Sequence, residues 1–167
     1  MHEAHRRMSR ESGFSIVEAL VALVVLSVGM LGIAALYVES LRAGRTAVYR
    51  TQAVNLASDM ADRIRANRNA GNAWALAAGD APTTQNCADS GAGSSVSCGA
   101  VAMAQDDQAR WLSAIADQLP GSPTANPQTP FGTIQVNAGA PTQYVVTVNW
   151  SEPGEQQVLS YALTVEI

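Results

Sequence analysis

The chain has 167 residues, of which 47% are hydrophobic and 14% charged, and its formal net charge at neutral pH is −4. This length accommodates one globular domain beside a long apolar segment. All ten basic residues are arginine and they form no basic stripe, so the composition argues against nucleic acid as a partner.

Residues 1–13 come before the long apolar segment of the chain. Three of them are arginines: Arg6, Arg7 and Arg10. About 20 uncharged residues then run from Ala19 to Val38, enough for one helix to cross a bilayer at about 1.5 Å per residue. Arginines before the span predict a cytoplasmic N-terminus and an exported C-terminal part.

The favourable cleavage position in this region lies after Gly13. A secretory signal is cut after its apolar region, whereas this position precedes it, so the apolar segment would be kept. Glu18 lies just inside that segment, where an unpaired charge costs about 2.5–3.5 kcal/mol on insertion scales. We therefore expect Glu18 to have a partner. A plain single-span anchor without processing remains the alternative.

The segment from this junction onward reads Gly13-Phe-Ser-Ile-Val-Glu-Ala-Leu-Val-Ala-Leu-Val-Val-Leu-Ser-Val-Gly-Met-Leu-Gly32. It resembles the processing site of the type IV prepilin family, and most of all the minor pilins of the PilV class. The resemblance implies that a prepilin peptidase cuts between Gly13 and Phe14 and that Phe14 becomes N-methylated. It also implies that Glu18 forms an assembly salt bridge with an α-amino group.

Two questions about this segment stay open. The amine on Phe14 could pair with Glu18 of its own chain, four residues on, or with Glu18 of a neighbouring subunit. Gly29 and Gly32 could permit close helix contact or local unwinding, or could simply be tolerated in a membrane helix.

A helical pattern continues beyond the membrane span. Apolar residues recur at spacings of three, four, seven and eight, which indicates one face of an amphipathic helix. They are Leu41, Val48, Ala53, Leu56, Ala57, Met60, Ala61 and Ile64. Asparagine and glycine cluster at 67–71 and end the pattern, so we expect one helix over 14–69 with a membrane span over about 14–38. No compact domain of this size covers a helix about 80 Å long, so its first half must contact lipid or other subunits.

Residues 70–104 have few charges and read as a loop, with a short turn around 74–78. Cys87 and Cys98 fit a disulfide in an oxidising compartment. A metal site is the weaker alternative, because both histidines lie in residues 1–13, the leader that cleavage after Gly13 would remove, and two cysteines at this spacing make a poor ligand set. Without those histidines the mature chain also lacks the commonest general base, which argues against hydrolase chemistry.

A second helix is expected over 105–119. Its apolar residues share one face: Trp111, Leu112, Ile115 and Leu119. Asp106 and Asp107 suit its first turn, which explains them better than a catalytic carboxylate pair does. Trp111 is expected in the core, although an aromatic ligand contact is the alternative. Four prolines between 120 and 130 indicate a connecting loop.

The remaining chain has β character. Strands are expected over 133–137, 143–150 and 157–167, with turn residues at 151–155. They predict an antiparallel sheet with one face covering the second half of the long helix. The expected fold class is therefore α+β and pilin-like: a long N-terminal helix, transmembrane and then amphipathic, packed on a small antiparallel sheet. The globular domain would span 70–167.

The functional expectation is a minor pilin, processed and incorporated into type IV pili, that contributes to assembly initiation or to the tip. Two alternatives remain: a minor pseudopilin of a type II secretion system, or a membrane-tethered periplasmic binding module. We expect no enzyme, catalytic residue, metal or cofactor, since nucleophile–base pairs and phosphate loops are absent from the mature sequence.

The resemblance also implies a set of partners and a location. The partners would be the prepilin peptidase, other major and minor pilins, the inner-membrane pilus assembly platform, a tip adhesin and membrane lipid. The chain would cross the bacterial inner membrane once, with its C-terminal domain in the periplasm, and later enter the filament. Twitching motility and adhesion are the processes in which such filaments act.

Overall fold

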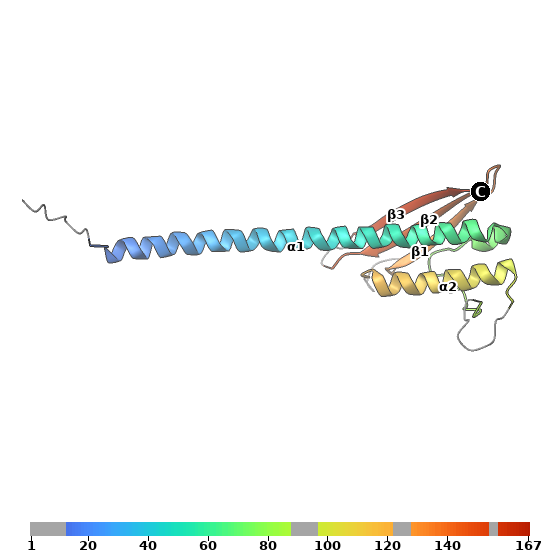
Figure 1. The fold of residues 1–167 in the computed structure, drawn as a ribbon, viewed down its shortest axis with the longest axis horizontal. Coiled ribbons are helices and arrows are strands. Elements are labelled where there is room, and N and C mark those ends of the chain that lie inside the picture. The colour runs from blue at the N-terminus through green and yellow to red at the C-terminus, as the bar shows by residue number, and fades with distance from the viewer. Residues whose placement is uncertain (1–12, 88–96, 122–127, 154–156) are drawn as a thin grey trace, which may run out of the picture. The chain divides into compact units, whose positions relative to one another are not determined.

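The computed structural model describes residues 13–87, 97–121, 128–153 and 157–167. The elements follow in the order helix α1 (Ile16–Ala66), 3₁₀ helix η1 (Arg68–Trp74), helix α2 (Ala100–Gln118), and strands β1 (Phe131–Asn137), β2 (Gln143–Ser151) and β3 (Val158–Glu166) (Figure 1). Two compact units divide the chain between Ala43 and Gly44. The fold is the expected α+β combination of a long helix and a small antiparallel sheet.

The first unit is helical from Ile16 onward, two residues later than expected. Its large apolar side chains are exposed along the helix, from Ile16 at 81% to Leu36 at 74%. By length and composition this part of α1 can cross a membrane. Since its own unit leaves these side chains uncovered, they are available to lipid or to other chains.

The second unit has its core along the last part of α1. Six side chains of that helix are buried: Ala53, Leu56, Ala57, Met60, Ala61 and Ile64. Val48 was expected on the same face but is 54% exposed, because it lies about 140° around the helix from Ala53 at 3.6 residues per turn. Leu41, also expected on this face, lies in the first unit and is 50% exposed. The helix ends at Ala66, three residues before the expected end at 69, and the Asn and Gly cluster begins directly after it.

The sheet is an antiparallel meander in the order β1-β2-β3, as expected. Alternate residues of its strands face the core and are buried: Ile134, Tyr144, Val146, Val148, Trp150 and Val165. The other face carries mainly polar side chains. Strand β1 begins at Phe131, two residues before the expected start, directly after Pro130.

Helix α2 begins at Ala100, five residues before the expected start. It packs against the second half of α1, where Trp111 is 1% exposed and donates a hydrogen bond from Nε1 to the Leu56 carbonyl at 2.9 Å. The core prediction for Trp111 is confirmed, and the ligand alternative is wrong. Gly132 of β1 lies beneath this indole, since a Cβ built on Gly132 would come within 2.3 Å of it.

The segment after α1, which was expected to be a loop, begins with the 3₁₀ helix η1. Residues of η1 turn the chain at Gly71, where φ is +53°, and bury Trp74. The Trp74 indole donates to the Asn67 carbonyl at 3.1 Å, and the Asn67 amide donates to the Ala100 carbonyl at 2.7 Å. The first bond connects η1 with the end of α1, and the second connects the end of α1 with the start of α2.

Candidate functional site

The candidate processing site lies just before α1. Gly13, Phe14 and Ser15 have no helical structure, and Phe14 is 72% exposed. The Ser15 carbonyl accepts the Ala19 amide at 3.1 Å, so hydrogen bonding of the first turn starts immediately after Phe14. The Gly13–Phe14 peptide bond is therefore in a non-helical segment, the form of backbone that a peptidase can bind.

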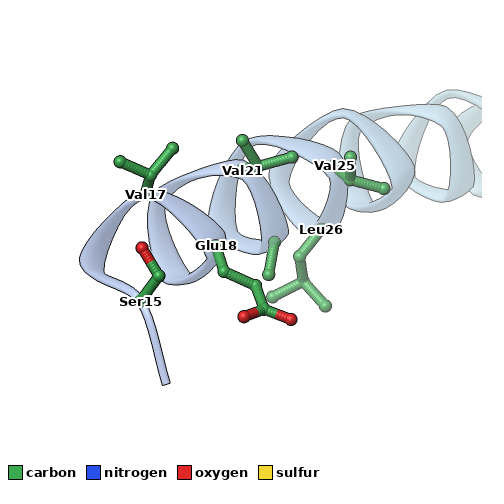
Figure 2. A pocket seen from close by; sticks show the side chains of 7 residues that line it. Ser15, Val17, Glu18, Val21, Val25 and Leu26 are labelled. Atoms are coloured by element: carbon green, nitrogen blue, oxygen red, sulfur yellow. The ribbon is translucent and has the colours of Figure 1, made fainter. Parts of the chain in front are cut away.

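Glu18 lies in the first turn of α1. A carboxylate at this position interacts favourably with the partial positive charge at a helix N-terminus. A shallow surface depression surrounds it, lined by Ser15, Val17, Glu18, Val21, Ala22, Val25 and Leu26. Figure 2 shows the Glu18 carboxylate projecting away from the helix, with Val17, Val21 and Val25 along another face. Among the described residues no cation pairs with Glu18.

This arrangement offers one charge in an apolar surface, and it contains no nucleophile–base pair. A lone carboxylate in such a surface favours a cationic partner. The described residues also include no group of three or more potential metal ligands.

The other predicted site residues lie in the second unit. Cys87 and Cys98 form a disulfide bond with a Cα–Cα distance of 5.7 Å, as expected. They lie between η1 and α2, and as a cystine they have no free thiolate to act as a metal ligand.

The expectation for Asp106 is wrong. It was placed in the first turn of a helix, but α2 starts earlier and Asp106 is fully buried. Its Oδ1 accepts the backbone N–H groups of Gln85 at 2.7 Å and Asn86 at 3.0 Å, and its Oδ2 accepts Arg110 Nε at 2.9 Å. Burial alone raises the pKa of this carboxyl, but the hydrogen bonds from Arg110, Gln85 and Asn86 together hold that pKa below its ordinary value.

Asp107 has a different role from its neighbour. Its carboxylate pairs with Arg63 at 2.6 Å, and Arg63 also pairs with Asp59 at 2.9 Å, so α2 is tied to α1. Burial lowers the pKa of the Arg63 guanidinium, but the hydrogen bonds to Asp59 and Asp107 raise it more. The two adjacent carboxylates thus have separate structural partners and do not form a catalytic pair.

Two family models match consecutive parts of the chain. The model described as the prokaryotic N-terminal methylation motif matches residues 8–34, and the model described as type IV pilin Tt1218 matches residues 35–109. The chain belongs to the type IV prepilin family. No curated protein and no solved structure matches the chain. The family assignment therefore depends on these two models, and the fold agrees with it.

As a type IV pilin, the protein is a structural subunit and not an enzyme. Its methylation motif implies processing by a prepilin peptidase, and its family implies assembly with other pilins. The exposed apolar half of α1 fits membrane anchoring of such a subunit. The sequence prediction of the family is confirmed.

Proposed function

We propose that this pilin is a minor subunit of the PilV class, incorporated into a type IV pilus, where it contributes to assembly initiation or to the tip. The observation that carries the incorporation into a filament is a helix whose first half exposes apolar side chains around one carboxylate, Glu18. The apolar surface of such a subunit must be covered by lipid before assembly and by the helices of other subunits afterwards. The extended Leu26–Gly32 sequence supports the PilV class over a secretion pseudopilin.

Processing is proposed between Gly13 and Phe14. This would remove residues 1–13 as the leader, leave a helical part over 14–69 and a globular domain over 70–167, and create a new amine on Phe14. N-methylation of that amine keeps it cationic near neutral pH. The free, non-helical residues before Ile16 support a cut at this position.

Glu18 is proposed to bind the methylated amine of Phe14 in a neighbouring subunit. Within an apolar bundle of helices, an unpaired carboxylate raises the free energy of the assembly, whereas a paired one is tolerated. Pairing therefore favours one axial register between neighbouring subunits. The same amine lies four residues before Glu18 of its own chain. This internal pair would neutralise the Glu18 carboxylate before assembly.

The proposed path begins in the bacterial inner membrane. The chain would cross it once, with a cytoplasmic N-terminus and the second unit in the periplasm, where Cys87 and Cys98 can be oxidised. The inner-membrane assembly platform would then move it into the filament, with a tip adhesin as a further partner.

Intact-mass analysis of the membrane-extracted protein tests the processing. We expect loss of residues 1–13, gain of one methyl group on Phe14 and loss of two hydrogens at the disulfide. Cells lacking the prepilin peptidase should yield the full-length mass. An unprocessed mass in peptidase-positive cells would contradict the proposal and leave a tethered domain.

A Glu18→Ala variant tests the assembly step. It should be processed and membrane-bound but reduced at least about tenfold in sheared pili, because an unpaired amine then remains in the helix bundle. Glu39→Ala, which removes an exposed carboxylate of the same helix beyond the span, is the control and should enter pili normally. Recovery of wild type with secretion machinery and not with pili would favour the pseudopilin instead.

A further inference from the structure

The two edges of the sheet differ in what covers them. The backbone of Ile134, in the middle of β1, exchanges two hydrogen bonds of 2.9 Å with Leu76, so that edge is occupied by the chain itself. Ile134 is the central residue of this seven-residue strand, so no second strand can pair along the whole of it. The edge formed by β1 is therefore closed.

The edge formed by β3 is open along the described residues. Thr142 and Ile167 exchange both backbone hydrogen bonds, at 3.1 and 3.0 Å. In an antiparallel pair such residues alternate with pairs that make no bonds to each other, so Ser160, Ala162 and Thr164 direct their N–H and C=O groups away from β2. The same alternation applied to β1 directs Ile134 outward, in agreement with its bonds to Leu76.

Strand β3 also lacks the usual protection of an edge. Soluble proteins protect edge strands with charges, prolines, bulges or short length. This strand has nine residues, contains no proline, and carries its single charge at Glu166, its last residue. Such an edge is a template for another strand, which indicates that a partner covers it in the working assembly.

A groove of about 360 Å³ runs beside this edge within the second unit. It is lined by Arg50, Val54, Trp150, Leu159, Ser160 and Tyr161. Val54, Leu159 and Tyr161 offer apolar contacts to alternate side chains of a bound strand. The buried indole N–H of Trp150, which borders the groove, has no acceptor among the described residues.

Arg50 gives the groove its charge. Its side chain is exposed, and none of the ion pairs among the described residues includes it. A carboxylate on the incoming segment would complement it. A second copy of this chain cannot extend the sheet in the same orientation, because it would have to offer its β1 edge, whose central residue is already paired with Leu76.

We propose that the open edge of β3 and the adjoining groove bind an extended peptide strand of a partner protein, with a carboxylate side chain of that strand facing Arg50. The main-chain groups of Ser160, Ala162 and Thr164 form the ladder with this strand. Val54, Leu159 and Tyr161 contact its inward apolar side chains. This surface is separate from the Glu18 site and independent of whether the protein is a minor or a major pilin.

The probe for the test is a labelled, capped heptapeptide Thr-Val-Thr-Asp-Thr-Val-Thr, whose aspartate and two valines share one face, added to the full mature chain in detergent. Binding is measured by fluorescence anisotropy, and hydrogen exchange is measured residue by residue. The peptide should slow amide exchange at Ser160, Ala162 and Thr164 and leave Gly132 and Val136 unchanged. A peptide N-methylated on alternate amides keeps its side chains but should not bind. Absence of parent-peptide binding up to about 1 mM overturns the proposal.

Variants of the protein distinguish backbone pairing at the β3 edge from a general apolar contact. Ala162→Pro removes an outward N–H, a substitution that an edge strand tolerates, and should abolish binding. Ala162→Val keeps that N–H and should bind as wild type does. Equal binding by the two variants, both shown to be folded by circular dichroism, overturns the proposal.

The charge is tested with Arg50→Gln, which should weaken binding of the aspartate peptide about threefold but leave an asparagine peptide unaffected. Arg45→Gln, an exposed arginine of α1 outside the groove, is the matched control. An equal loss with both peptides overturns the role of Arg50. Dimerisation of the peptide-free protein that Ala162→Pro abolishes would show that a second copy occupies the edge, which also overturns the proposal.

Discussion

Asp106 is a fully buried carboxylate that receives three hydrogen bonds, two of them from backbone amides of the segment before Cys87. Replacing it with alanine would leave these donors and the Arg110 guanidinium without their acceptor. We expect Asp106→Ala to lower the free energy of unfolding by about 3 kcal/mol, measured by denaturant unfolding in detergent. Asp117→Ala, at an exposed position of the same helix, should change it by less than about 0.5 kcal/mol.

The lowered pKa of Asp106 also predicts that the free energy of unfolding depends on pH. Below its ordinary value of 3.8 the unfolded chain takes up a proton while the native carboxylate stays charged. The stabilisation is therefore complete above about pH 5 and is lost as the pH falls through the lower, native pKa. Between about pH 5 and 3, unfolding free energy should fall more steeply for wild type than for Asp106→Asn. Identical slopes would contradict the assignment.

Sequence reasoning placed Asp106 at a helix start because its partners could not be read from local spacing. Gln85 and Asn86 lie about 20 residues earlier, and only the folded chain brings their amides to the carboxylate. Burial of an aspartate also contradicts the ordinary preference of that residue for the surface. In contrast, Gly13 and Phe14 lie at the boundary between the charged residues before them and the long apolar segment, and Glu18 is the charge inside that segment, so sequence alone makes these positions visible.

At the scale of the elements, α1 and the β2–β3 hairpin could be predicted because their periodicity is strong over many residues. The start of α2 was missed because Ala100-Val-Ala-Met-Ala-Gln carries neither a charge nor a side-chain cap, and Gly99 precedes it without a cap bond. The 3₁₀ helix was missed because short elements follow tertiary contacts, here those of Trp74. Val48 was misassigned because apolar character alone does not fix which face of a helix is covered.

The contact between α2 and β1 depends on Gly132. A methyl group there would overlap the Trp111 ring and approach Ile115 within 2.8 Å. We expect Gly132→Ala to destabilise the fold by about 1–3 kcal/mol, observed as a lower thermal midpoint. Gly44→Ala is the control: a Cβ at this helical position meets nothing within 4 Å, so the variant should be neutral or up to about 1 kcal/mol more stable.

At the scale of the whole molecule, the two units require different surroundings to be stable. Among the described residues, all buried core side chains lie at Ala53 or later, whereas the first unit exposes its apolar surface. A fragment beginning at Gly44 should therefore be soluble without detergent, with a thermal midpoint within about 5 °C of the full chain in detergent. A fragment beginning at Ala57 loses Ala53, Leu56 and the carbonyl that Trp111 binds, and should not fold cooperatively.

The burial of all three tryptophans has a practical consequence for spectroscopy. Trp74, Trp111 and Trp150 are at most 2% exposed and all lie in the second unit, so indole fluorescence reports on that unit alone. Transfer of the first unit from lipid to detergent should leave the emission wavelength unchanged, while unfolding of the second should shift it to the red. Of the three indoles, Trp150 alone lines the groove beside β3, so the chain carries a native optical sensor for what docks there.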